Sequence, residues 1–215
     1  MVRDQSTMQA DSRARFLDVA LKVIRSKGYT ATSVEDLCTE AKLTKGSFFH
    51  HFASKQDLGV AAAEYWSKIT DALFAAAPYQ AIEDPLQRLL GYVDFRAAIL
   101  RGELPEFTCL VGTMVQEVYD THPQIRAACD RSISNHAANV EKIIVEAMSR
   151  YRIKSDWTGA SLALHTQAVL QGAFILAKSK ENPAVAAESI AHLRRYIELL
   201  FAQPQKRKKK HVRPR

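Results

Sequence analysis

The residues with the clearest chemical potential lie between Thr44 and Phe52, where Lys45, Gly46 and Ser47 open a short predicted helix. Lysine can donate hydrogen bonds to guanine O6 and N7, and serine can pair with several bases. Gly46 has no side chain, so the start of this helix can approach another surface closely. Residues at the N-terminal end of a recognition helix reach base edges in the major groove. This segment therefore predicts base-specific contacts with double-stranded DNA.

A second group of polar residues is placed to hold the DNA backbone. Thr32 and Ser33 precede a predicted helix, whose free amides can bind a phosphate. Lys55 lies in the first turn of a later helix, where a cation opposes the helix dipole, so this position suits a phosphate contact better than a role in stability. His50 and His51 can donate hydrogen bonds from their ring N–H groups to the DNA backbone. Because they are adjacent, they point about 100° apart and cannot form a helical metal pair, and we predict no metal site and no cofactor.

The cysteines offer one further reactive group. Cys38, Cys109 and Cys129 are too far apart for a CxxC metal motif or a disulfide framework. Cys109 lies at the predicted start of a helix, where amide dipoles lower the pKa of a thiol. It could be a thiolate that reacts with electrophiles or oxidants, or a buried apolar filler.

The chain has no GxSxG, HExxH or P-loop motif, so no catalytic residue is predicted. A helical enzyme built from acids and histidines is the alternative from another class.

The elements that must position these residues are helices. Glycine is scarce, with 8 residues, and no run of alternating β-branched and polar residues suggests a sheet. Ser33, Thr44 and Ser54 read as N-caps of three successive helices, and the turn at 42–44 between the first two is that of a helix-turn-helix. The predicted helices are 11–27, 34–41, 44–52, 54–76, 85–100, 108–119, 123–150, one capped by Asp156, and 184–201, with a break at Gly102–Pro105.

These elements define the domain organisation that we predict. The fold is all-α with about nine helices. An N-terminal three-helix helix-turn-helix domain occupies residues 1–58, and a C-terminal helical domain for ligand binding and dimerisation occupies residues 59–205. Residues 206–215 form a basic tail, which is too charged and too interrupted by proline to pack, and we predict it to be disordered.

The net charge of +7 lies in that tail. Residues 206–215 hold seven Lys and Arg residues and no acidic residue, so the rest of the chain is neutral overall. The charge therefore says little about the folded body. It leaves open a third class, a nucleoid-type or RNA-binding protein that binds through its tail without sequence preference. The polar N-terminus and the lack of an apolar run near ~20 residues predict a cytoplasmic protein that does not enter the membrane.

The segments Gly28–Val34, Lys42–Phe52 and Ser54–Leu58 resemble the TetR family of bacterial repressors. The pattern of that family reads roughly Gly-Tyr, Thr-Ser or Thr-Thr, a short helix, Lys-Gly-Ser-x-Tyr-x-His-Phe, and Ser-Lys-Glu-x-Leu. The match is continuous from residue 13 to 58, and the rest of the chain is similar to the family in length and helix pattern. Phe49 stands where the family usually has tyrosine, so the hydroxyl that commonly meets a phosphate is missing here. Phe49 would pack on a sugar or a thymine methyl instead.

The resemblance implies a ligand-responsive transcriptional regulator that is not an enzyme. The family's usual mode is repression by steric block, with release of a pseudo-palindromic operator when a small molecule binds; activation stays open. The last two helices would form a homodimer, with Leu193, Ile197 and Leu200 in its seam beside the small residues Gly172, Ala173, Ala187 and Ala191. The candidate DNA contacts are Thr32, Ser33, Lys45, Gly46, Ser47, Phe48, Phe49, His50, His51 and Lys55, of which Phe48 could equally be a core residue. The candidate effector contacts are Trp66, Tyr92, Phe95, Cys109, Met114, His136, His165, Gln167 and Phe174.

Overall fold

A computed structural model describes residues 5–202, with the side chains of residues 11–202; the predicted tail at 206–215 lies outside this part. Within the described residues the chain is all-helical and contains no strand, which confirms the predicted fold class. The helices are α1 (Gln5–Lys27), α2 (Val34–Ala41), α3 (Lys45–His51), α4 (Lys55–Ala75), the 3-10 helix η1 (Pro78–Ala81), α5 (Pro85–Ala98), α6 (Leu104–Phe107), α7 (Leu110–Val118), α8 (Pro123–Arg150), α9 (Gly159–Ser179) and α10 (Ala184–Ala202).

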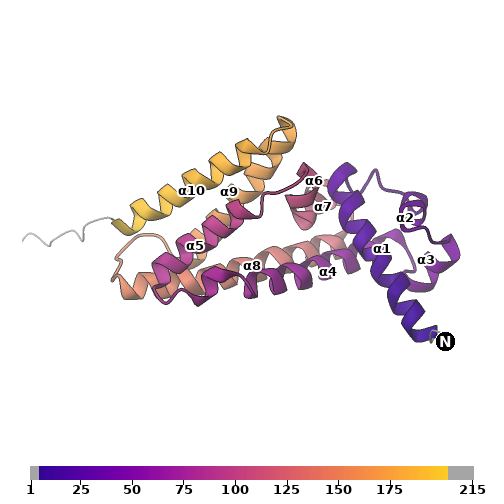
Figure 1. Cartoon of the computed structure of the whole chain (residues 1–215), viewed down its shortest axis with the longest axis horizontal. Coiled ribbons are helices and arrows are strands. Elements are labelled where there is room, and N and C mark those ends of the chain that lie inside the picture. Colours follow the sequence, from indigo (N-terminus) through magenta and orange to yellow (C-terminus); the bar gives the residue numbers. More distant parts are fainter. Residues whose placement is uncertain (1–4, 203–215) are drawn as a thin grey trace, which may run out of the picture.

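The first three helices form a small head at one end of an elongated molecule (Figure 1). Each short helix begins where the sequence predicts: the side chains of Ser33, Thr44 and Ser54 accept hydrogen bonds from backbone amides in the first turns of α2, α3 and α4. These caps satisfy amides that have no partner within the helix. The turn between α2 and α3 passes through Lys42, whose left-handed φ of 53° closes the end of α2. The head is therefore a helix-turn-helix.

The body consists of long helices that run away from the head. Helix α4 starts in the head and continues beside α8, which packs in turn against α5, α7 and α9, and α10 lies against α5 and α9 (Figure 1). Two apolar cores result. One links the head to α4, α7 and the start of α8. The other fills the space between α5, α8, α9 and α10. The first core ties the orientation of the head to the body.

The structure differs from the predicted elements at four places, one of which is the 3-10 helix η1 that the sequence did not predict. The segment predicted as a break contains the short helix α6, because Pro105 suits a first turn and the carboxylate of Glu106 accepts from the backbone amide of Glu103 at 2.8 Å. The described part thus has ten α-helices rather than nine. Thr158 rather than Asp156 caps α9. Helix α1 begins at Gln5 instead of Asp11.

Helix α9 is apolar along most of its length. By length and composition it could cross a membrane, which the inspection of the sequence did not predict, and it is the one such helix among the described residues. In the fold, 44% of its most apolar window is buried inside the protein. Core helices commonly have this composition, and the remaining apolar residues of α9 lie on an open face that is described below.

Candidate nucleic-acid interface and ligand cavity

The N-terminal end of α3 is an open surface. Lys45 is largely exposed and pairs at 3.1 Å with Glu35, which is also largely exposed. Such a surface pair contributes little to stability, so Lys45 is free to exchange this carboxylate for another partner. A Cβ atom on Gly46 would meet only the Thr44 hydroxyl, at an ordinary 3.7 Å. The fold does not itself require glycine here. The close approach of Gly46 to DNA stays a prediction.

Two adjacent phenylalanines of α3 have opposite environments. Phe48 is fully buried; its ring packs edge-on against Phe16, with centroids 5.4 Å apart, and is tilted against Phe52 at 5.5 Å. Phe49 is 55% exposed. Phe48 is therefore a core residue of the head and not a DNA contact, which corrects its place among the candidates. Phe49 and the half-buried Ser47 remain on the open side of the helix.

The two histidines at the end of α3 also differ in their environments. His50 is exposed, whereas His51 is half-buried and its Nε2 lies 2.6 Å from the hydroxyl of Ser12 on α1. Burial lowers the pKa of His51, and the charges of His50 and Arg13 lower it further. The ring of His51 thus fastens α3 to α1, and His50 is the histidine that is free to meet a phosphate.

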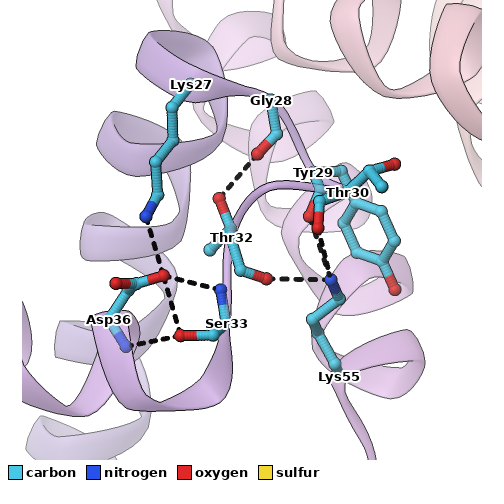
Figure 2. A network of polar contacts seen from close by, with 8 residues as sticks. All are labelled: Lys27, Gly28, Tyr29, Thr30, Thr32, Ser33, Asp36 and Lys55. Atoms are coloured by element: carbon cyan, nitrogen blue, oxygen red, sulfur yellow. Dashed lines mark hydrogen bonds and ion pairs between the residues drawn. The ribbon is translucent and has the colours of Figure 1, made fainter.

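The predicted phosphate site at Thr32 and Ser33 is already filled from within the chain (Figure 2). Thr32 is buried, and its hydroxyl donates to the carbonyl of Gly28 at 2.6 Å. The Asp36 carboxylate accepts from the backbone amide and the hydroxyl of Ser33, at 2.8 and 2.7 Å. Lys27 pairs with the same carboxylate at 2.7 Å and, together with the Ser33 donors, lowers the pKa of Asp36. An anion occupies the helix start, so these two residues do not receive a phosphate in this conformation.

Lys55 has a different role from the predicted one. Its ammonium donates to the carbonyls of Tyr29 at 3.0 Å and Thr32 at 2.8 Å, with a longer contact to Thr30, and lies 4.4 Å from the centre of the Tyr29 ring (Figure 2). Burial lowers the pKa of Lys55, and the charge of Glu117 opposes this shift. The three protons of the ammonium have acceptors inside the loop. Lys55 therefore positions the α1–α2 loop, and the phosphate contact is not formed here.

The same loop is held from the other side by the body. The carboxylate of Glu117 on α7 accepts from the backbone amides of Tyr29 at 3.1 Å and Thr30 at 2.8 Å. Gly28, with a φ of +92°, allows this approach, because a Cβ atom there would lie 2.6 Å from a Glu117 oxygen. The Glu117 carboxylate thus accepts hydrogen bonds from the amides of the loop, and the Lys55 ammonium donates hydrogen bonds to its carbonyls. The orientation of the loop therefore depends on Lys55 at the head and on Glu117 in the body.

Lys55→Ala tests the positioning role. We expect a loss of about 1–3 kcal/mol in the free energy of unfolding, because partly buried carbonyls lose their donor. DNA affinity should fall as the loop loosens, but the slope of log affinity against log salt should not change, since this slope counts the phosphates engaged. Urea unfolding and salt titrations measure the two effects, and Lys68→Ala on the exposed side of α4 removes the same charge as a control. A salt slope that falls by about one, with unchanged stability, would instead show that Lys55 contacts a phosphate.

A cavity of about 160 Å³ lies in the body; it is partly open to solvent and is lined by side chains of α4 to α9. Five of the predicted effector residues line it: Trp66, Cys109, His136, Gln167 and Phe174. Prediction missed Arg96, Phe74, Phe107 and Gln171 among the other lining residues. A signal for Arg96 was present, because it follows the buried Tyr92 and Val93 by one helical turn and continues the apolar face of α5.

The other predicted effector residues lie outside this wall. Tyr92 is fully buried behind it, where its hydroxyl lies 2.9 Å from Nε2 of His136 and accepts from Gln167 Nε2 at 3.3 Å. Phe95 packs in an aromatic cluster with Phe74. Met114 is a core residue with no exposed surface. His165 is exposed on α9, and its ring lies 5.2 Å from that of Tyr196 on α10. Their side chains fill the core or face outward, so they do not line the cavity.

Cys109 lies where the cavity meets a second hollow, which Thr113, Glu117 and Lys178 also line. It is the N-cap of α7, and its sulfur accepts from the Gly112 amide at 3.4 Å. No cation lies near it in the sequence, but the fold places Arg25 and Lys178 close enough for their charges to interact with it. Its reactivity stays a prediction.

One residue of the head touches the wall of the cavity. The guanidinium of Arg25, near the end of α1, lies 5.1 Å from the centre of the Trp66 ring and donates to the carbonyl of Glu106 at 2.7 Å. Lys178 on α9 donates to the carbonyl of Arg25 at 3.0 Å. Trp66 and Glu106 both line the cavity. A molecule in the cavity would therefore press on residues that hold the end of α1.

An apolar face on α9 and α10 has no covering element within the described residues. We call it the α9–α10 face; its exposed residues are Leu164, Ile175, Leu176, Tyr196 and Leu199. A Cβ atom on Gly172 would meet nothing within 4 Å, so the surface is open there. Leu193 and Ile197, predicted for a dimer seam, are only 3% and 0% exposed and belong to the core of the protomer. The exposed apolar residues of α10 are instead Tyr196 and Leu199.

An exposed recognition helix on a helix-turn-helix head, joined to a helical body with a cavity, defines a one-component DNA-binding regulator. Residues 16–62 match the family model for bacterial regulatory proteins of the tetR family, and residues 85–193 match the tetracyclin repressor-like C-terminal domain. The chain belongs to the TetR family.

Several curated relatives span most of the chain. The transcriptional repressor DhaR of Mycobacterium sp. strain GP1 is 25% identical over 79% of this chain and 84% of its own length. The transcriptional regulator AcuR of Cereibacter sphaeroides is 28% identical over 76% and 74%. The transcriptional repressor NemR of Escherichia coli K12 is 27% identical over 87% and 94%. All three are transcriptional regulators.

Solved structures agree in fold. A TetR-family regulator from Agrobacterium tumefaciens superposes with a TM-score of 0.78 at 18% identity, covering 87% of this chain and 98% of its own. The reduced form of Escherichia coli NemR superposes with a TM-score of 0.74 at 21% identity, covering 85% and 95%.

Proposed function

We propose that this chain is a homodimeric repressor that binds a pseudo-palindromic operator and releases it when a small molecule occupies the cavity. The observation that carries the proposal is the contact of Arg25 with the cavity wall, because it connects a sensor space to the helix that supports the DNA-reading head. The names of the relatives agree with this class, as DhaR and NemR are both repressors. We also propose the division near residue 58, within α4, between the DNA-binding head and the sensor body.

Release requires that the ligand bind two states of the protein unequally. A molecule between Trp66 and Phe174 would displace the Trp66 ring or the α6 backbone. Arg25 would move with either of them, because its guanidinium lies over the Trp66 ring and donates a hydrogen bond to the Glu106 carbonyl. Because Glu117 fixes the next loop to α7, a shift of α1 relative to α7 would also rotate α2 and α3. The two recognition helices of a dimer would then lose the spacing of their half-sites.

DNA reading falls to the exposed part of α3. We propose base contacts from Lys45 and Ser47, apolar contact from Phe49 and a phosphate contact from His50. In a dimer the two heads would meet successive major grooves, about 34 Å apart. The second copy would cover the α9–α10 face, where five large apolar side chains are exposed and the surface at Gly172 is open.

Selection of binding sites from random DNA tests the proposal. The wild type should select an inverted repeat, and Lys45→Ala should lose preference at one base pair in each half-site, at a cost of about 1–3 kcal/mol. Lys22→Ala, on the side of α1 that pairs with Glu40, removes a cation of the same head as a control and should return the wild-type motif. No enriched motif, or binding that depends only on residues 206–215, would contradict a repressor and favour a non-specific nucleic-acid binder.

A further inference from the structure

The cavity has the size of a small organic molecule. Its volume of about 160 Å³ is close to that of engineered cavities that hold benzene. Its walls are mainly apolar and aromatic, with Trp66, Phe74 and Phe174 contributing rings. Apolar walls with a few placed polar groups are typical of small-molecule sites. The space therefore fits a compact body of about six to ten heavy atoms.

Arg96 supplies a charge to this apolar space. Its guanidinium lies 5.2 Å from the centre of the Phe74 ring and 5.8 Å from that of Phe174, so two aromatic faces hold it at the wall. Between residues 11 and 202 no carboxylate lies within ion-pairing distance of it. Asp94, two residues earlier, pairs instead with Arg194 at 2.8 Å. Arginine offers donors in a planar fork that matches a carboxylate, and here the fork has no anionic partner.

The polar floor of the cavity consists of neutral groups joined by hydrogen bonds. The amide of Gln167 donates to the Tyr92 hydroxyl, which lies 2.9 Å from Nε2 of His136. A hydroxyl has one proton and two lone pairs, so that of Tyr92 can accept from Gln167 and either donate to Nε2 or accept from it, according to the tautomer of His136. Burial, and then the charge of Arg96, lowers the pKa of His136 to about 3, so the ring is neutral at pH 7. The floor therefore adds no competing positive charge.

One acidic residue, Glu106, also lines the cavity, and it does not neutralise this arrangement. One of its carboxylate oxygens accepts from the backbone amide of Glu103 at 2.8 Å, in the cap of α6. Its charge acts on Arg25 rather than forming an ion pair with Arg96. The Arg96 guanidinium would repel a cationic ligand, whereas an anionic ligand would form an ion pair with it. Charge complementarity thus selects the sign of the ligand.

We propose that the effector is a small organic monocarboxylate whose carboxylate binds the Arg96 guanidinium and whose apolar or aromatic body fills the space between Trp66, Phe74 and Phe174. This inference rests on the proposed function, because it assigns a chemical class to the molecule that releases the operator. The neutral isostere of such an acid would fit the same volume but would leave Arg96 without an anion.

Calorimetric titration with benzoate, cyclohexanecarboxylate and the neutral benzamide tests this assignment. At least one of the acids should bind the wild type about tenfold or more tightly than benzamide, because charge-assisted hydrogen bonds are the stronger kind. Arg96→Gln should weaken binding of that acid about ten- to hundredfold and leave benzamide unchanged. Arg101→Gln, an exposed arginine just beyond α5, should bind as the wild type does. The melting temperature of each variant shows that the fold is intact.

The outcomes separate this inference from the proposed function. Failure of both acids to bind, equal binding of benzamide, or unchanged acid affinity in a folded Arg96→Gln variant would overturn the carboxylate assignment. Gel-shift assays with the selected operator then test release. If an acid binds through Arg96 and the operator stays bound, the assignment of the cavity stands and ligand-induced release is wrong. If benzamide releases the operator and the acids do not, release stands and the carboxylate assignment falls.

Discussion

Phe48→Ala should lower the free energy of unfolding by about 3–5 kcal/mol, which is the usual range when a phenylalanine is removed from a core. The ring has no exposed surface and packs against Phe16 and Phe52, so its loss would leave a cavity at the centre of the head. Operator binding should disappear with it, because α3 would lose its attachment. Urea unfolding, followed by circular dichroism, measures the change in stability.

Phe49→Ala is the matched neighbour. Phe49 is 55% exposed, so its truncation should change the unfolding free energy by less than about 0.5 kcal/mol, as for most surface substitutions. It should still weaken operator binding, because Phe49 is the large apolar side chain on the open side of the recognition helix. A destabilisation by Phe49→Ala as large as that by Phe48→Ala would show that the two rings do not divide between core and surface as the structure has them.

Leu199→Glu should convert a dimer into folded monomers with very weak operator affinity. Leu199 is 66% exposed on the α9–α10 face, so a charge there costs little in the protomer but would be buried without a partner in a dimer. Loss of the second head should weaken operator binding about 100-fold or more, since the two half-sites no longer act together.

Sedimentation velocity and gel-shift assays measure these effects. Val145→Glu, on an exposed residue of α8 outside the face, is the matched control and should stay dimeric. A wild type that sediments as a monomer, or a Leu199→Glu protein that remains dimeric, would contradict the proposed dimer. Leu193 and Ile197 are unsuitable for this test, because both are buried in the protomer and their substitution would unfold it.

The local part of the fold could be predicted from the sequence. Caps and turns depend on residues three or four positions apart, so Ser33, Thr44 and Ser54 marked the starts of α2, α3 and α4. The exposed position of Lys45 and Gly46 followed from the same caps. Family resemblance then carried the overall architecture.

Partners that are distant in the sequence could not be predicted. The position of Lys55 suggested a free cation, but its acceptors are carbonyls that lie 23 to 26 residues earlier. Cys109 has no cation nearby in the sequence, whereas α1 and α9 bring Arg25 and Lys178 to it. These contacts arise from helix packing, which leaves no local pattern.

The dimer seam illustrates a different limit. Helix α10 is apolar on two sides, and an apolar pattern alone does not say which side meets the core. Packing against α5 and α9 buries Leu193 and Ile197 and leaves Tyr196 and Leu199 outside. Likewise, an arginine within the apolar face of α5 could have indicated Arg96, but its aromatic neighbours come from α4 and α9.

The most direct test of the central claim is a fluorescence anisotropy titration of the whole protein against its selected inverted repeat and a scrambled duplex of equal length at about 150 mM salt, near physiological ionic strength. We predict a stoichiometry of two protomers per operator and an affinity for the operator at least about 10³-fold higher than for the scrambled duplex, the range of specific DNA-binding proteins. Equal affinity for the two duplexes would contradict sequence-specific recognition by α3 and, with it, the assignment of this chain as an operator-binding repressor.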